Sequence, residues 1–374
     1  MDPRSLERFV CGRPDQGAGD FAAAARSAWA DLFAALAVEG LAPGDVTVER
    51  IFLSDIAAQH QPAHEARTAA YRDAGVTLPL ASFVEQPPAI PGRPLEILAH
   101  AVRDAGGRAT VKPLAGLPAG AEGASIRCAG ARRLVLCGLT GGEPGDGLPF
   151  AAQAARLFAR SGTCLLREGM TFRQVARTWL FVTHIDRDYS DLNAARRAYF
   201  EAAGVHPPPA STGIGGRAHP GDRLLSLDLV AFDGATSVRP LSTPAMNEAP
   251  AYGSDFSRGF EVRLQDRRLV FVSGTASIDA TGQVAHTGDA TAQARRMLDN
   301  VGRLLESAGA SPRDLVHAVT YLKDPADRNA LDTALATSSF DPHLPHVVCR
   351  AEVCRPDWRC EMEGLAVLPP VGPG

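Results

Sequence analysis

Residues 266–277, DRRLVFVSGTAS, repeat the pattern of residues 131–142, ARRLVLCGLTGG. In each stretch two arginines precede four apolar residues and then a turn of small residues that carries Thr140 or Thr275. A short apolar run that enters such a turn is typical of a buried strand. Two similar strands far apart in one chain indicate two copies of one structural unit.

The similarity continues downstream of both strands. Residues 151–182, AAQAARLFARSGTCLLREGMTFRQVARTWLFV, parallel residues 291–322, TAQARRMLDNVGRLLESAGASPRDLVHAVTYL. Each reads as an amphipathic helix, a glycine (Gly169 or Gly309) that ends it, and an apolar strand. A second helix and two final strands follow in each copy. This order predicts an α/β (α+β) fold with mixed sheets, both helices on one face, and the two copies packed on each other.

The length of 374 residues favours two domains, since one core rarely grows beyond about 250 residues. We expect an N-terminal domain at 1–240, made of an α/β lead-in segment and a first copy at about 130–235. A C-terminal domain at 241–374 would hold a linker and the second copy. The lead-in has an Ala-rich, helix-prone stretch, FAAAARSAWADLFAALAVEG, but no clear identity of its own.

Composition limits the partners. A net charge of −4 supplies no basic field for a phosphate backbone, so no nucleic-acid partner is expected. The first residues lack the apolar run of a secretory signal, and no stretch nears the ~20 apolar residues of a membrane span. We therefore expect a cytoplasmic protein that does not associate with a membrane. The seven cysteines and ten histidines show no metal-site spacing, so no metal is expected.

The last strand carries the most informative carboxylates. Glu361 and Glu363 are two residues apart and therefore share one face of the strand. When the copies are aligned, Glu361 falls opposite Ser226 and Glu363 opposite Asp228, so the first acid is peculiar to the second copy. A carboxyl that is desolvated has a raised pKa and can act as a general acid near neutral pH. The alternative is a solvated or arginine-paired edge residue.

Other candidate residues surround this strand. Cys354 precedes Glu361 by seven residues, and hairpin pairing can bring the two together, although an isolated cysteine is more often a small buried residue. The loop PPASTGIGG (208–216) exposes backbone N–H groups as anion binders do, or is only a structural turn. Arg177, Arg258 and Arg350 are candidates to bind carboxylates in a bidentate manner.

The second copy, from GTASIDATGQV to CRPDWRCEMEGLAVL, resembles the RidA/YjgF family of enamine and imine deaminases. The functional glutamate of that family falls on Glu361. Its carboxylate-binding arginine falls near 348–350, with Arg350 out of register by about two positions, which speaks against simple imine hydrolysis.

The whole chain better resembles the chorismatases, enzymes with RidA-like domains that include 3-hydroxybenzoate synthases and chorismate hydrolases of polyketide starter pathways. RTWLFV, YSDLNAARRAYF, PASTGIGG, SDFSRG, VSGTASI and CRPDWRCEMEG carry this resemblance. It implies a cleft between the copies that binds chorismate without cofactor or metal, where Glu361 protonates the enolpyruvyl group and pyruvate leaves. It also implies that Cys354 favours 3-hydroxybenzoate as product. The residues implied in binding are Arg177, Tyr199, Thr212, Gly213, Arg258, Gly274, Ala276 and Arg350.

Several alternatives stay open at this point. One alternative is a chorismatase that makes 4-hydroxybenzoate or a dihydroxycyclohexadiene carboxylate instead of 3-hydroxybenzoate. A RidA-like deaminase would need an open pocket at Glu361, and a non-catalytic binding or scaffold protein would leave Glu361 solvated. Two fused copies bury between themselves the surface that single-copy relatives bury by forming trimers, so a monomer is expected.

Overall fold

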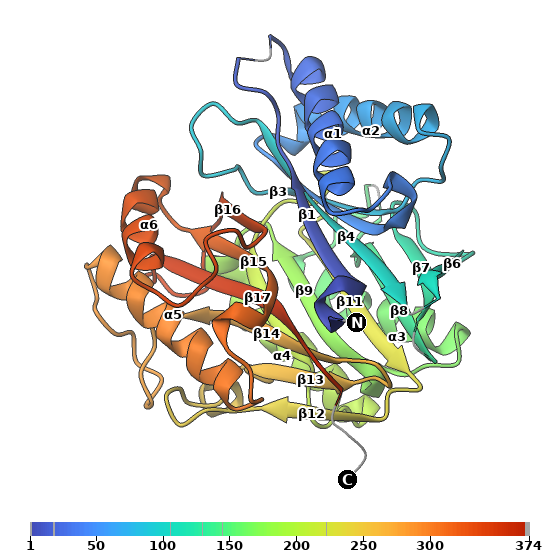
Figure 1. Ribbon diagram of the computed structural model, residues 1–374. Helices are drawn as coiled ribbons and strands as arrows, with labels where there is room; N and C mark the ends of the chain where they lie inside the picture. Colours follow the sequence, from blue (N-terminus) through green and yellow to red (C-terminus); the bar gives the residue numbers. More distant parts are fainter. Residues whose placement is uncertain are drawn as a thin grey trace.

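The structure is a computed structural model that describes residues 2–370 apart from residues 18, 105, 129, 144 and 222. It consists of three units, each a sheet with two helices on its outer face (Figure 1). The first unit comprises β1 (Glu7–Gly12), α1 (Phe21–Val38), β2 (Val46–Leu53), α2 (Ile56–Asp73), β3 (Leu80–Glu85), β4 (Leu95–Asp104) and the short β5 (Gly107–Arg108).

The second and third units have the two helices and mixed sheets that the repeat predicted. The second comprises β6 (Thr110–Pro113), β7 (Glu122–Cys128), β8 (Ala131–Thr140), α3 (Phe150–Arg167), β9 (Val175–Val182), α4 (Ile185–Ala203), β10 (Ala210–Gly215) and β11 (Leu225–Asp233). The third comprises β12 (Ser237–Leu241), β13 (Gly259–Arg263), β14 (Arg268–Ala276), α5 (Ala290–Glu306), β15 (Leu315–Leu322), α6 (Arg328–Ala336), β16 (His346–Arg350) and β17 (Cys360–Leu368).

The first unit is a third copy of the repeat, which differs from the expected lead-in segment. The strand orders are β1-β4-β2-β3, β6-β7-β8-β11-β9-β10 and β12-β13-β14-β17-β15-β16. In each unit one strand (β4, β11 or β17) lies centrally and antiparallel to both neighbours, while the edge strand that precedes it is parallel to its neighbour. The three units therefore share one four-strand topology, and the first lacks the two outer strands that extend the other sheets, β6 and β7 or β12 and β13.

Local details repeat three times as well. A glycine with positive φ follows the first helix of each unit: Gly40 (69°), Gly169 (71°) and Gly309 (69°). A polar side chain just before the next strand then accepts a hydrogen bond at 2.8 Å from the backbone N–H three residues earlier: Asp45 from Ala42, Gln174 from Thr171 and Asp314 from Ser311. The same turn thus leads from helix to strand in all three units.

Strand register shows which residues correspond between the units. In the central strands, Glu96 pairs with Phe52, Ser226 with Phe181 and Glu361 with Tyr321. The alignment of Glu361 with Ser226 is therefore confirmed, and Glu96 holds the same place in the first unit.

The inner faces of the three sheets meet around a common centre, and the helices lie outside (Figure 1). Near one end, Glu7 of the first unit binds Arg133 of the second at 2.5 Å and Arg267 of the third at 2.9 Å. Elsewhere Arg50 lies 3.2 Å from Glu363 and 3.7 Å from Asp228. Buried ion pairs thus connect all three units through the centre.

Helix α1 is, within the described residues, long and apolar enough to span a membrane, with a mean hydropathy of 1.3. The expectation that no stretch of the chain is long and apolar enough for a membrane span was therefore wrong. In the structure this helix packs on the first sheet: Ala28, Trp29 and Leu32 are fully buried, and the indole N–H of Trp29 donates to Glu49 at 3.0 Å. A core helix of this kind meets the same length and hydropathy criteria as a membrane span.

Candidate active site

The site lies where edge strand β10 of the second unit meets β14 of the third. The Ser211 N–H donates to Ser273 Oγ at 2.9 Å, and the Gly274 N–H donates to Thr212 Oγ1 at 2.9 Å. These bonds hold the two strands side by side. Because β17 is paired with β14, its Glu361, opposite Ala276, is brought to the same interface.

Glu361 is a buried carboxyl without an ion pair among the described residues. Its side chain belongs to a residue that is 3% exposed, and Oε2 has no hydrogen-bond partner there. Desolvation, followed by the nearby charge of Glu363, raises the pKa of Glu361 to about 8. At neutral pH the carboxyl therefore carries a proton that it can transfer.

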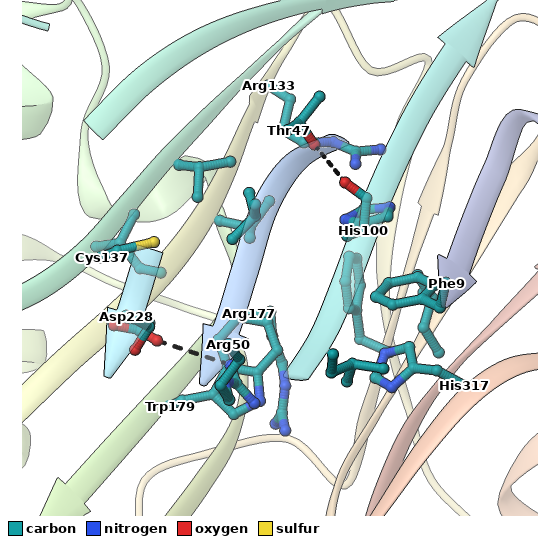
Figure 2. Close-up of a pocket in the computed structure, with 18 of the residues that line it drawn as sticks. Phe9, Thr47, Arg50, His100, Arg133, Cys137, Arg177, Trp179, Asp228 and His317 are labelled. Carbon is teal, nitrogen blue, oxygen red and sulfur yellow. Dashed lines mark hydrogen bonds and ion pairs between the residues drawn. The ribbon is translucent and has the colours of Figure 1, made fainter. Parts of the chain in front are cut away.

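Glu363 lies on the same strand but has several donors. Arg177 binds it at 2.7 Å, Arg50 at 3.2 Å, and the Trp179 indole N–H at 2.7 Å. Figure 2 shows Arg50, Arg177 and Trp179 side by side at a central cavity of about 80 Å³. Arg177 is thus engaged by Glu363 and acts on Glu361 from a distance. Arg50 and Trp179 were not predicted from the sequence, because their contacts with Glu363 cross from one unit to another.

Thr212 and Gly274 shape the space around the acid. Thr212 Oγ1 accepts hydrogen bonds from Arg177 at 2.5 Å and from the Gly274 N–H at 2.9 Å. A Cβ atom at Gly274 would lie 1.9 Å from Glu361 Oε1, much too close for any side chain. A side chain at this position would therefore displace the Glu361 carboxyl or the strand.

Cys354 lies near Glu361, but the predicted hairpin is wrong: β15 lies between β16 and β17, so these two strands do not pair with each other. Burial raises the pKa of its thiol to about 12, and the charge of Glu361 adds to the rise. The thiol also interacts with the Tyr189 hydroxyl, which lies 3.1 Å from Ser254 Oγ. A thiol with this pKa is neutral at physiological pH, so it is a small, weakly polar neighbour of the acid and not a thiolate nucleophile.

Two buried arginines, Arg258 and Arg196, supply positive charge near this interface. Arg258 is 1% exposed. Its guanidinium donates to the backbone oxygen of Asn247 at 2.8 Å and to Asn247 Oδ1 at 3.1 Å. Arg196, on α4, is 2% exposed and binds Asn193 Oδ1 at 2.5 Å. The ring of Phe256 lies 5.6 Å from each guanidinium. Arg258 was expected at the site, whereas Arg196 was missed.

The helical spacing of Tyr189, Asn193 and Arg196 contained a signal for this part of the site. Residues four and three apart share one face of a helix, and all three side chains are polar or amphipathic. In the structure this face of α4 lies towards the interface, where Tyr189 contacts Ser254 and Cys354.

Two expected residues lie elsewhere. Tyr199 packs between α3 and α4, where its ring stacks on Phe158 at 5.8 Å and faces Phe172 edge-on at 5.4 Å. It follows Tyr189 by ten positions, so it points to another face of the helix. Arg350, at the end of β16, is exposed and lines a different cleft with Asp324 and Asp357. The site thus combines Glu361, Cys354, Thr212, Gly213, Gly274, Ala276 and Arg258, with Arg177 behind them.

Within the described residues, no group of three or more histidine, cysteine, aspartate or glutamate side chains is arranged to hold a metal ion. The described cysteines are all free thiols.

Comparison with known proteins adds to this picture. Residues 246–368 match the family model described as endoribonuclease L-PSP. The chain is 32% identical over 99 residues to the 3-aminoacrylate deaminase RutC of Acinetobacter baylyi, covering 26% of this chain and 78% of that protein. It is also 32% identical over 99 residues to a RutC family protein of Pyrococcus abyssi, covering 26% and 77%.

One solved structure matches nearly the whole chain. It is the crystal structure of a chorismatase, with a TM-score of 0.65 and 19% sequence identity over 96% of this chain and 98% of that one. At this identity the match establishes a shared fold. The chain therefore has the fold of a chorismatase and, through its third unit, belongs to the RutC and endoribonuclease L-PSP family.

Proposed function

We propose that the protein is a chorismatase that releases pyruvate from chorismate, with Glu361 as the proton donor. The observation that carries this proposal is the buried carboxyl of Glu361, which has no ion pair among the described residues and whose pKa is raised to about 8 at the interface of two units. The shared fold with a chorismatase over almost the full length supports it.

The proposed chemistry begins at the enol ether of chorismate. Glu361 transfers its proton to the terminal methylene carbon, and the electrons of the C=C bond form the new C–H bond. The adjacent carbon becomes an oxocarbenium-like centre. The carboxylate that Glu361 now carries lies close to this positive charge and stabilises it.

The oxocarbenium centre can then collapse in two ways. If the neighbouring ring hydroxyl attacks, its oxygen bonds to this centre; loss of the ring proton next to the ether oxygen then breaks the attacking oxygen's bond to the ring, and the ring aromatises. The resulting hemiketal splits into pyruvate, which keeps the attacking oxygen, and a hydroxybenzoate, which keeps the ether oxygen, without net water. If water attacks, one water is consumed and a dihydroxycyclohexadiene carboxylate remains. We infer 3-hydroxybenzoate as the product, because the neutral Cys354 thiol does not hold a water as an amide or carboxylate does.

The two carboxylates of chorismate need donors. Arg258 and Arg196 offer positive charge that is shielded from bulk solvent. The backbone of β10 offers a further donor: Ser211 and Gly215 both donate across the interface, and alternate N–H groups of an edge strand point the same way. The Gly213 N–H, between them, therefore points into the site.

The test is to incubate the purified protein with chorismate, without added metal or cofactor, and to measure pyruvate while the ring products are separated by chromatography. Pyruvate with 3-hydroxybenzoate is the expected result. Pyruvate with 4-hydroxybenzoate or a dihydrodiol would retain the reaction class and overturn the product. No pyruvate would refute the proposal.

A second candidate function is the deamination of small enamines, which the 32% identity to a 3-aminoacrylate deaminase favours. The carboxylate-binding arginine of that family was expected near Arg350, which is exposed and lies in another cleft. Ammonia release from a 3-aminoacrylate-type enamine, with no turnover of chorismate, would favour this alternative.

We also infer that the protein acts in the cytoplasm. All seven cysteines are free thiols, as is usual in a reducing compartment.

A further inference from the structure

The interface between the first and second units has residues that correspond to those of the candidate active site. Helices α2 and α4 follow the same strand in their units and both begin with an isoleucine, so His60 and His64 on α2 occupy the positions of Tyr189 and Asn193 on α4. Residues four apart are neighbours on a helix surface. Where α4 presents a phenol and an amide to its interface, α2 therefore presents two imidazoles.

The second unit contributes a third imidazole to this interface. His219 precedes Ser226 by seven residues, as Cys354 precedes Glu361. Ser226 and Glu361 hold the same register position, so His219 takes the place of Cys354. The rings of His60 and His219 stack across the interface, with centroids 4.1 Å apart and planes 11° apart. Two imidazoles thus meet here, where a phenol and a thiol meet in the active site.

An aromatic ring packs against this group. In the register of their strands, Phe83 of β3 corresponds to Gly213 of β10. The Phe83 ring lies 4.7 Å from the ring of His60 and 6.4 Å from that of His64. This interface has a large side chain where the active site has a glycine, and Ser226 where it has the acid. It therefore lacks the proton donor of the active site and serves as a contact between units.

The three imidazoles repel one another when they are protonated. His60 lies between the other two, 4.1 Å from His219 and 6.3 Å from His64. Burial, followed by the charges of His219 and His64, lowers the pKa of His60 to about 4. β3 faces it with an uncharged ring, and Glu85 and Arg217 form an ion pair of their own at 3.8 Å across the same interface. The charges that shift the pKa of His60 are thus both like charges.

From this stack we infer that the contact between the first and second units is acid-sensitive: protonation of the three histidines separates α2 and β3 from the loop that carries His219. The direction follows from proton uptake. Above about pH 7 the histidines are neutral in both states, so pH has no effect. As pH falls from 6.5 towards 4, a released His60 binds a proton that it does not hold in the stack, so acid favours the loosened state.

Backbone hydrogen bonds beside the stack report on this contact. The Glu85 N–H donates to Arg217 O at 3.0 Å, and the Gln86 side chain donates to Gly215 O at 2.7 Å. Both bonds join β3 and its continuation to the second unit. The Glu85 N–H loses its partner when the two units separate, so its exchange with solvent measures the contact.

The test is hydrogen–deuterium exchange of the full chain at pH 7.5 and pH 5.0, with rates corrected for the intrinsic effect of pH. We expect the β3 peptide to exchange about tenfold faster at pH 5.0, because opening is coupled to proton uptake by the half-buried His60. Helix α5, which contains no histidine, is the internal reference and should exchange equally at both pH values.

His60→Phe keeps an aromatic ring in the stack but cannot be protonated, so its β3 peptide should exchange equally at both pH values. His219→Gln, at an exposed position, removes one of the like charges and should reduce the response to acid. His343→Gln is the control, since His343 is exposed and lies outside this interface, and it should respond as the wild type does.

Equal β3 exchange of the wild type at both pH values would overturn the inference. So would an acid response that survives in both His60→Phe and His219→Gln, because it would come from other buried histidines such as His346, whose pKa burial lowers to about 4. The inference rests on the geometry of another interface and pyruvate release is not its readout, so failure of the chorismatase proposal would leave this result interpretable.

Discussion

The carboxyl of Glu361 is subject to two influences in the same direction: it is removed from water, and it lies two residues from Glu363. Both disfavour the charged form, so the acid is protonated below a pH of about 8 and loses its proton above it. We expect kcat/KM for pyruvate release to be flat up to about pH 7 and to fall above about pH 8, because only the protonated form can donate. A profile that rises between pH 7 and 9 would contradict this role.

Replacing the acid tests the same role directly. Glu361→Gln keeps the shape of the side chain but removes the transferable proton, so kcat/KM should fall by about 10²–10⁴-fold. Glu352→Gln is a suitable control, since Glu352 is an exposed residue of the connection between β16 and β17. Steady-state pyruvate assays on both variants, with circular dichroism to verify folding, provide the comparison.

The same substitution should make the protein more stable at neutral pH. Between pH 4.5 and about 8, unfolding lets Glu361 ionise while the folded state keeps its proton, so the folded state loses stability as pH rises through this window. At pH 7 the cost is about 3 kcal/mol, which Gln does not incur. Urea unfolding should show Glu361→Gln to be more stable than wild type at pH 7 and equal to it near pH 4. A loss of stability at pH 7 would mean that the carboxyl is ionised in the folded protein.

At the scale of single elements, β14 depends on a glycine. The Cβ of Gly274→Ala would lie 1.9 Å from Glu361 Oε1, so either the strand or the acid must move. We expect a loss of activity of at least about 100-fold, as misplacement of a catalytic group by about 1 Å can cause. Gly302→Ala, on α5, is the control, because its Cβ meets only Pro312 Cγ at 3.8 Å and alanine favours the helix by about 1 kcal/mol. Equal activity of the two variants would show that the geometry around Glu361 is not tight.

The elements also show what the sequence can and cannot predict. The repeat of residues 131–142 in 266–277 predicted two units and singled out Glu361, because the copies differ there in one polar residue. The first unit escaped notice, since only a short pattern such as Pro43 and Asp45, matched by Pro312 and Asp314, links it to the others. Arg50 was beyond reach, because its contact with Glu363 joins residues that only the packing of three units brings together.

At the scale of the whole molecule, the three units of one chain make with each other the contacts that three separate copies would make in a symmetric trimer. Each edge strand already meets the next unit: Ala89 N–H donates to Val348 O at 2.8 Å, Glu85 N–H to Arg217 O at 3.0 Å, and Ser211 N–H to Ser273 Oγ at 2.9 Å. No open interface of this kind is left within the described residues. We therefore expect light scattering coupled to size exclusion to give a monomer of 39.4 kDa, and a trimer mass would contradict this view.

The centre of the molecule gives the last prediction. Arg50 of the first unit lies 3.2 Å from Glu363 of the third and 3.7 Å from Asp228 of the second, over the ring of Trp179 at 4.4 Å (Figure 2). Its guanidinium is thus shared by all three units. Arg50→Met leaves two buried carboxylates with one fewer cation, and removing one partner of a buried pair costs about 3–5 kcal/mol.

Because Glu363 also helps to raise the pKa of Glu361, the loss of Arg50 should change activity as well as stability, although the two residues belong to different units. With Arg50 gone, the negative charge at Glu363 is less compensated, so the pKa of Glu361 should rise and the alkaline limb of kcat/KM should move above pH 8. Arg8→Gln is the control, since Arg8 forms an exposed pair with Glu39 at 3.4 Å within the first unit, and such pairs contribute at most about 1 kcal/mol. Urea unfolding and pH profiles of both variants test this coupling. If the alkaline limb of kcat/KM does not shift in a folded Arg50→Met protein, the charges at the centre do not affect the pKa of Glu361.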